Sequence, residues 1–284
     1  PTIENEEEAF LNTNDISIEN GYLVTKAYKE KTTVEVKGIR IGDEEPVVIS
    51  GPCSVESEEV VRRIATEIKK IGVDILRGGA FKPRTSPYDF QGLGKGGIDI
   101  LYKIGKEFNM PIVTEIMDIR DLDYMIDKVD IFQVGSRNMY NYSMLKELGK
   151  IDKPILLKRG LSATIKEFLL SAEYIMLGGN EKIILCERGV RTYEKCTRNT
   201  MDIAAIPLLK KMTHLPIIAD PSHATGKREL IESMSRASIS AGADGLIIES
   251  HSNPENAWSD GMQSINMYNL SEIIQYLKVQ NKKR

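Results

Sequence analysis

The stretch PILLKRGLSATIKEFLLSAEYIMLGGNEKIILCER, residues 154–188, contains the unit from which most of the chain is built. A short apolar run, PILLKR, ends in charged residues, and a second run, KIILCER, ends in the same way. Between them, TIKEFLLSAEYIMLGG (164–179) has the apolar spacing and the final glycines of an amphipathic helix. A strand, a helix and a second strand in this order predict two parallel strands joined by a right-handed crossover.

Similar runs occur along the chain and bring the total to eight. The others are PVVISG (46–51), DILRGG (74–79), PIVTEI (111–116), IFQVGS (131–136), PIIADP (216–221) and DGLIIES (244–250). Eight strands that alternate with helices predict a closed (β/α)8 TIM barrel, for which about 250 residues are typical. The alternative is a doubly wound open sheet. It gains no support, because the glycine-rich GLGKGG (92–97) follows a long loop and is interpreted as a loop leading into a helix.

The clearest helix is predicted for SEEVVRRIATEIKKIG, residues 57–72. Its apolar residues form one stripe, Ser57 can cap the first turn, and Gly72 stands where a left-handed residue ends a helix. Further helices are predicted at 228–242 and, near the end of the chain, at 270–280.

The first 35 residues differ from the rest of the chain. They open with the acidic PTIENEEEAF and show no clear period, so we expect a loosely ordered or peripheral arm over residues 1–35. The alternation in KTTVEVKGIRIG (31–42), with Gly38 in the middle, predicts a short hairpin. We expect the catalytic barrel, with this hairpin at its start, over residues 36–284.

The composition argues against several classes of protein. The chain has 284 residues, enough to bury a large core, and its formal net charge is -3. With this charge we expect no nucleic-acid partner. Because no apolar stretch approaches the roughly 20 residues that cross a bilayer, we expect no membrane partner either. Cys53, Cys186 and Cys196 are odd in number and far apart, which argues against a disulfide framework and favours a cytoplasmic location.

Polar or reactive residues follow all eight apolar runs, and in this class of barrel the carboxyl ends of the strands meet at one catalytic mouth. One set has the residue types of metal ligands: Cys53, His223, Glu249 and, after the last run, Asp260. A thiolate, an imidazole and carboxylates suit one divalent ion such as Mn, Fe, Co or Zn. The alternative for Cys53 is a small buried apolar residue.

A second set of residues at these ends is basic. It consists of Arg77, Lys82, Arg84, Arg137, Lys158 and Arg188. Each could form surface ion pairs, but together in one pocket they would bind phosphate and carboxylate groups, which indicates two anionic substrates or one highly charged substrate. Glu115 and His251 also follow strands, whereas His214 precedes one and is interpreted as an ordinary loop residue.

Together these motifs resemble those of the 3-deoxy-D-arabino-heptulosonate 7-phosphate (DAHP) synthases, in particular the type I-beta subgroup. The motifs are GPCSVES, RGGAFKPRTSPYDFQGLG, VTE, QVGSRN, LLKRG, CERGVRTYE, ADPSHATG, IIESH and WSDG. The resemblance implies a (β/α)8 barrel and a metal-dependent transferase. Such an enzyme condenses phosphoenolpyruvate with erythrose 4-phosphate and water to give DAHP and phosphate, the first step of the shikimate pathway to aromatic amino acids.

The resemblance also implies a role for each residue at the mouth. The divalent metal would be held by Cys53, His223, Glu249 and Asp260. Phosphoenolpyruvate would be bound at its carboxylate by Arg77, Lys82 and Lys158, and at its phosphate by Arg137, Lys158 and Arg188, beside Gly135 and Ser136 of a GSR motif that reads GAR in many relatives. Erythrose 4-phosphate would be received by Arg84 and Thr85. Glu115 would order water and basic groups.

The proton donor is expected to be Lys158, because neighbouring cations make a lysine release its proton more readily. A metal-bound water is a competing donor, and His251 is a weaker one.

Two alternatives to this function are a related synthase with another sugar substrate and a barrel without catalytic activity. The 3-deoxy-D-manno-octulosonate 8-phosphate synthases, which use arabinose 5-phosphate, share the barrel and much of the metal site. They typically carry KANRSS where this chain has KPRTSP (82–87), and DATHS where it has DPSHA (220–224). A silent barrel that serves as a partner of chorismate mutase would be expected to lack a ligand or an anion-binding arginine, and none is missing.

The same resemblance gives expectations about feedback inhibition and about the oligomeric state. Many relatives carry an N-terminal regulatory domain, and an arm of about 35 residues is too short for one. We therefore expect weak or no feedback inhibition by aromatic amino acids through such a domain. The family also implies a homodimer or a homotetramer.

Overall fold

The computed structural model describes residues 21–84 and 86–281. Eight parallel strands close into a barrel in which chain order is also spatial order. The strands are β3 (Val47–Gly51), β4 (Ile75–Arg77), β5 (Ile112–Glu115), β6 (Ile131–Val134), β7 (Ile155–Lys158), β8 (Ile183–Glu187), β9 (Ile217–Ala219) and β10 (Gly245–Glu249). Strand β10 pairs with β3 and closes the cylinder. The predicted (β/α)8 barrel and its eight predicted strands are confirmed.

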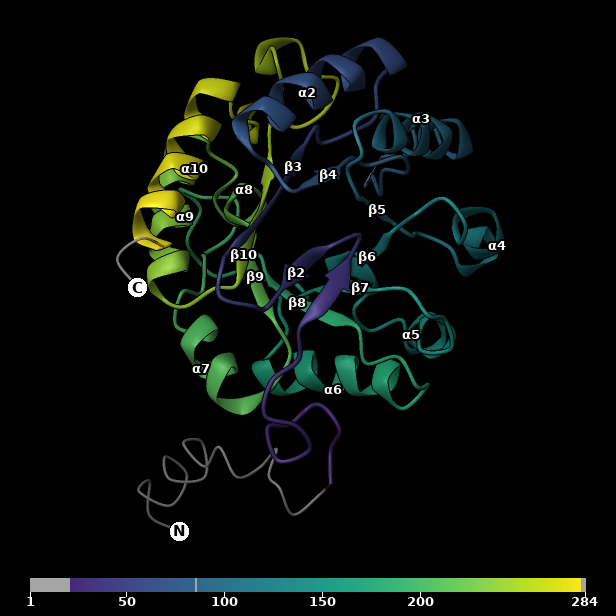
Figure 1. Ribbon diagram of the computed structural model, residues 1–284, viewed down its shortest axis with the longest axis vertical. Coiled ribbons are helices and arrows are strands. Elements are labelled where there is room, and N and C mark those ends of the chain that lie inside the picture. Colours follow the sequence, from purple (N-terminus) through teal and green to yellow (C-terminus); the bar gives the residue numbers. More distant parts are fainter. Residues whose placement is uncertain (1–20, 85, 282–284) are drawn as a thin grey trace.

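Helices connect the strands and surround the barrel (Figure 1). They are α2 (Glu58–Ile71), α3 (Lys95–Glu107), α4 (Leu122–Met125), α5 (Tyr142–Leu148), α6 (Ile165–Met176), α7 (Ala205–Met212), α8 (Pro221–Thr225), α9 (Ile231–Ser240) and α10 (Met267–Asn281). Helix α2 is capped as predicted: the Ser57 side chain accepts a hydrogen bond from the Val60 N–H, and Gly72 has a φ of 98°. Among these helices of the described chain, none is both long and apolar enough to span a bilayer.

Two predicted helices differ from the observed ones in where they begin. Helix α9 follows a 3-10 turn at Arg228–Leu230, so the α-helical part of the predicted 228–242 segment is shorter. Helix α10 begins at Met267, before the predicted start at residue 270. GLGKGG (92–97) leads into α3, as predicted.

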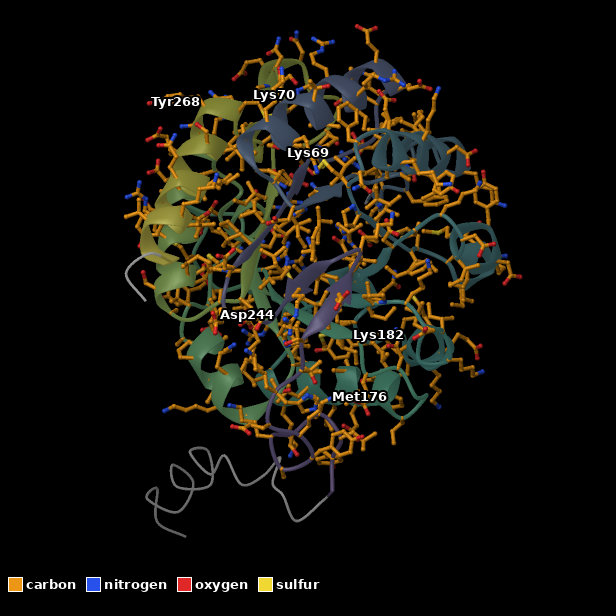
Figure 2. All side chains as sticks on the ribbon, viewed as in Figure 1. Lys69, Lys70, Met176, Lys182, Asp244 and Tyr268 are labelled. Atoms are coloured by element: carbon orange, nitrogen blue, oxygen red, sulfur yellow. The ribbon has the colours of Figure 1, made fainter. Side chains whose placement is uncertain are left out.

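Strand residues alternate between two apolar clusters, because successive side chains of a strand point to opposite faces. Leu76 and Phe132 belong to the cluster between the strands and the helices. Their neighbours Ile75 and Ile131 belong to the cluster inside the barrel. The interior is therefore a packed core rather than a channel. Figure 2 shows all described side chains on the ribbon, seen from the same direction as Figure 1.

A hairpin of β1 (Val34–Val36) and β2 (Ile39–Ile41) covers the amino end of the barrel. Its strands are antiparallel, and Val34, Val36 and Ile41 belong to the interior cluster. In Figure 1 the hairpin lies across the ring of strands. The predicted hairpin is confirmed, and because it starts at Val34 it straddles the boundary expected at residue 36.

The segment before the hairpin also contacts the barrel. The N–H groups of Leu23 and Val24 donate to the Glu173 carboxylate at 3.0 and 2.8 Å. His214 Nε2 lies 2.8 Å from the Leu23 carbonyl oxygen, so His214, although it is in a loop away from the mouth, is a buried anchor rather than an ordinary loop residue. Residues 1–20 of the expected arm lie outside the described part of the chain.

Candidate active site

A polar layer lies directly above the apolar interior of the barrel. In a strand, residues i and i+2 lie on the same face. In six of the strands the last inward-facing apolar residue is followed, two positions later, by a polar residue on that face. The pairs are Ile75 and Arg77, Val113 and Glu115, Ile131 and Gln133, Leu156 and Lys158, Ile218 and Asp220, and Ile247 and Glu249. The same alternation that builds the core therefore builds the floor of the site.

A cavity of about 290 Å³ opens above this floor at the carboxyl ends of the strands. Its basic lining residues are Lys82, Arg84, Arg137, Lys158, Arg188, Arg191 and Arg198. Its other polar lining includes Asp89, Glu115, Gln133, Gly135, Ser136, Asn199, His223 and Asp260. Most of the residues predicted for the mouth thus share one cavity, and its basic lining suits an anionic ligand.

Three of the four predicted metal ligands form one group, which we call the metal group: Cys53, Glu249 and Asp260. Their ligand atoms all lie within 4.8 Å of one another. His223 lies beside the group, with Nε2 3.3 Å from Glu249 Oε1. Its Nδ1 is buried and makes no properly directed hydrogen bond to the described residues. A sulfur, two carboxylates and an adjacent imidazole, whose Nε2 faces the group, fit a divalent first-row ion.

The position of Cys53 depends on the end of β3. Gly51 has a φ of 152°, and a Cβ at this residue would lie 2.2 Å from the Arg77 carbonyl oxygen. Burial, together with nearby Glu249, raises the pKa of the Cys53 thiol to about 12. The thiol therefore keeps its proton until a metal ion displaces it.

Cations surround the metal group. Lys82 Nζ lies 2.9 Å from Cys53 Sγ, and Arg77 Nη1 lies 2.8 Å from Glu249 Oε1. Burial alone would raise the pKa of Glu249, but His223, Arg77 and Lys82 hold it well below its ordinary value. Arg77 lines a smaller adjoining cavity of about 30 Å³, which Lys82 shares.

Arg188 has the features expected of an anion-binding residue. Its side chain is buried, burial lowers its pKa, and its Nε has no hydrogen-bond partner among the described residues. A buried donor without a partner is rare in native proteins and indicates a missing acceptor. A phosphate or carboxylate oxygen would supply that acceptor.

Glu115 and Gly135 fit together closely. A Cβ at Gly135 would lie only 2.1 Å from Glu115 Oε1, so only glycine leaves room for this carboxylate. Gln133 Nε2 donates to Glu115 Oε2 at 3.2 Å. Burial raises the pKa of Glu115, and the positive charges of Lys158, Lys82 and Arg137 oppose that shift.

Four predicted residues of the described chain do not line the cavity of about 290 Å³: Arg77 lines the smaller adjoining one, Cys53 and Glu249 belong to the metal group, and His251 belongs to neither. His251 is buried, its Nδ1 accepts from the Asn253 N–H, and its Nε2 lies 3.6 Å from Glu56 Oε1. It is not among the residues that line the cavity, so the geometry gives no support to a role as proton donor. Thr85 lies outside the described residues, whereas its neighbour Arg84 lines the cavity and lies 3.5 Å from Asp89.

Sequence reasoning did not assign a role to several residues of the site. Gln133 and Asp220 are inward-facing, and the period of two after Ile131 and Ile218 could have identified both. Arg198 comes from the loop after β8, and no sequence period predicts its position. Its Nη1 donates to Gln263 Oε1 at 2.7 Å, and Gln263 Nε2 donates to Glu249 Oε2 at 2.6 Å.

Comparison with known proteins identifies one family and relatives with two related names. The DAHP synthetase I family matches residues 21–283. A phospho-2-dehydro-3-deoxyheptonate aldolase of Thermotoga maritima is 47% identical over 269 residues, which are 92% of this chain and 80% of the relative. A 2-dehydro-3-deoxyphosphooctonate aldolase of Francisella tularensis subsp. mediasiatica is 29% identical over 265 residues, 86% of this chain and 95% of the relative.

Solved structures show the same relationship. The crystal structure of the Thermotoga maritima DAHP synthase has a TM-score of 0.89 and 46% sequence identity, and the match covers 92% of this chain and 77% of that one. A truncated form of the Thermotoga enzyme has a TM-score of 0.86 and 45% identity, with 92% and 96% covered. The family match, these relatives and the motifs at the strand ends agree, and the chain belongs to the DAHP synthetase I family.

Proposed function

We propose that this protein condenses phosphoenolpyruvate with erythrose 4-phosphate and water to give DAHP and inorganic phosphate, the first step of the shikimate pathway. The observation that carries the proposal is the cavity at the carboxyl end of the barrel, where the metal group adjoins a basic lining. The 47% identity to the Thermotoga enzyme supports this activity. The octulosonate enzymes are more distant, at 29% identity, so they are the second candidate.

The basic residues bind and orient the two anions. We assign the carboxylate of phosphoenolpyruvate to Arg77 and Lys82, and its phosphate to Arg137, Lys158 and Arg188. Arg84, which also lines the cavity, is assigned to the phosphate of erythrose 4-phosphate. Holding both reactants in one orientation removes much of the entropic cost of bringing them together.

The metal group and His223 would hold one divalent ion, Mn, Fe, Co or Zn, which when bound supplies Lewis-acid polarisation of the aldehyde oxygen. We assign Lys158 as the proton donor to that oxygen as C3 of phosphoenolpyruvate attacks the aldehyde carbon. Arg137 and Arg188 stabilise the phosphate that leaves C2 after water has added there. We further propose a homodimer or homotetramer, on the strength of the family resemblance, and a cytoplasmic location, which the spacing of the cysteines favours.

A phosphate-release assay tests this function. The purified protein is treated with a chelator, then supplied separately with Mn, Fe, Co or Zn, phosphoenolpyruvate and either erythrose 4-phosphate or arabinose 5-phosphate. We expect phosphate release only with a restored metal, and much faster with erythrose 4-phosphate. A preference for arabinose 5-phosphate would establish the second candidate, and unchanged activity after chelation would refute the metal assignment.

A further inference from the structure

Asp220 connects the anion-binding floor to the metal site. It is 1% exposed, and its Oδ2 lies 2.5 Å from Lys158 Nζ and 2.7 Å from His223 Nδ1. Its Oδ1 accepts a hydrogen bond from the backbone N–H of His223 at 2.9 Å. Nothing in the predicted chemistry gave this carboxylate a role, although it contacts two residues that have one.

The ring of His223 lies between two acidic groups. Nδ1 faces Asp220, and Nε2 faces Glu249 of the metal group. A carboxylate that already binds an ammonium group and an amide N–H acts as an acceptor, so the ring nitrogen beside it must carry the proton. Nε2 then keeps the lone pair that a metal ion requires.

We propose that Asp220 is a positioning residue that fixes the Nδ1–H tautomer of His223 and so directs Nε2 toward the metal group, an inference that rests on the proposed function. Lys158 Nζ contacts the same oxygen, Asp220 Oδ2, that faces Nδ1, and so helps to hold Asp220 in place. In the present rotation of the ring, the Nδ1–H bond is not aligned with Asp220 despite the short distance. A rotation that aligns it also redirects Nε2, so the two contacts of the ring are coupled.

The substitution Asp220→Asn distinguishes a positioning role of Asp220 from a purely structural role as a helix cap. Asp220 also caps helix α8 through the His223 N–H. Asparagine caps helices about as well as aspartate, so Asp220→Asn retains the cap. Its amide group, however, presents a donor or a neutral oxygen where the carboxylate receives Lys158 and His223. The substitution therefore separates the cap from the positioning role.

The tautomer can be measured without any variant at Asp220. Nitrogen-15 NMR of histidine-labelled, metal-free protein at about pH 8 reports the neutral tautomers, because imidazole is deprotonated there. Only three histidines occur in the chain, and single His→Gln variants assign their signals. We expect Nδ1–H for His223 but Nε2–H for His251 and His214, whose Nε2 faces the Leu23 carbonyl. An Nε2–H signal for His223 would overturn the proposal.

Metal affinity provides the second test. In competition with a chromogenic chelator, Asp220→Asn should weaken Zn binding about 10- to 100-fold, the usual effect of removing such a partner. The matched control is Asp118→Asn, because Asp118 caps an exposed 3-10 turn and accepts from the Arg120 N–H. The control should bind Zn like the wild type. An Asp220→Asn affinity within about twofold of the wild type also overturns the proposal, since removing a partner of a metal-binding histidine usually weakens metal binding at least about tenfold.

Neither experiment measures turnover. If the phosphate-release assay failed, the tautomer and the Zn affinity would still report on Asp220. If Asp220→Asn failed to fold, the wild-type tautomer would decide the question.

Discussion

The volume that single residues occupy or leave free determines the geometry of the site as much as their charge does. Glu115 occupies the volume that a side chain at Gly135 would fill, and the Arg77 carbonyl occupies that of a side chain at Gly51. Both glycines stand beside charged groups of the site. A motif such as GSR therefore encodes the room for a neighbouring carboxylate as well as the arginine that follows it.

The substitution Gly135→Ala tests this close fit. The added methyl would lie 2.1 Å from Glu115 Oε1, so the carboxylate or the end of β6 must move. We expect a loss of about 1–3 kcal/mol in the free energy of unfolding, measured with urea, and a lower kcat. The control is Gly96→Ala in helix α3, where a Cβ meets nothing within 4 Å and higher helix propensity should stabilise by up to about 1 kcal/mol. Wild-type stability and activity in Gly135→Ala would show that the site does not depend on the close fit between Gly135 and Glu115.

Residue types at the strand ends were predictable, but the direction of each side chain was not always clear. Arg159 and Glu187 directly follow or precede Lys158 and Arg188 in the sequence. They point to the other face and pair with each other at 2.8 Å, outside the cavity. His251 is likewise directed to Glu56. Alternation separates inner from outer positions within a strand, whereas after the strand has ended only the loop conformation decides.

At the scale of elements, the apolar runs and the glycine and serine caps specify the strands and the best helices. Helix α2 begins and ends at the residues that its caps predict, because Ser57 and Gly72 supply local hydrogen bonding and a left-handed turn. The anchoring of the N-terminal segment was not predictable. It depends on Glu173 and His214, which come from distant elements and carry no local pattern.

The anchor formed by His214 predicts a dependence of stability on pH. Burial lowers the pKa of His214 in the folded state. The unfolded chain, with a histidine pKa of about 6.5, therefore binds the proton first as the pH falls. The contribution of His214 to the free energy of unfolding is therefore complete above about pH 6.5. It is lost as the pH falls from there through the lower pKa of the folded state.

Urea denaturation of the wild type and of His214→Asn, between about pH 7.5 and 5, measures this contribution. We expect the wild type to lose more free energy of unfolding than the variant over this range. The buried His223 is common to both proteins, so its contribution cancels in the difference. Parallel pH profiles would show that His214 is not responsible.

At the scale of the whole molecule, closure of the barrel creates the metal group. Cys53 follows the first barrel strand and Asp260 follows the last, 207 residues apart in sequence, yet Cys53 Sγ lies 3.2 Å from Asp260 Oδ2. This contact exists because β10 pairs with β3. An open sheet would place these strands at separate positions and would leave Cys53 without its partners.

The most direct test is anomalous diffraction from crystals of the chelated protein soaked with Zn²⁺. We expect one strong peak about 2.3 Å from Cys53 Sγ and about 2.0–2.2 Å from carboxylate oxygens of Glu249 and Asp260. His223 Nε2 should complete the coordination. A peak bound elsewhere, or a Cys53 sulfur that makes no contact with the ion, would show that these residues do not form a metal site.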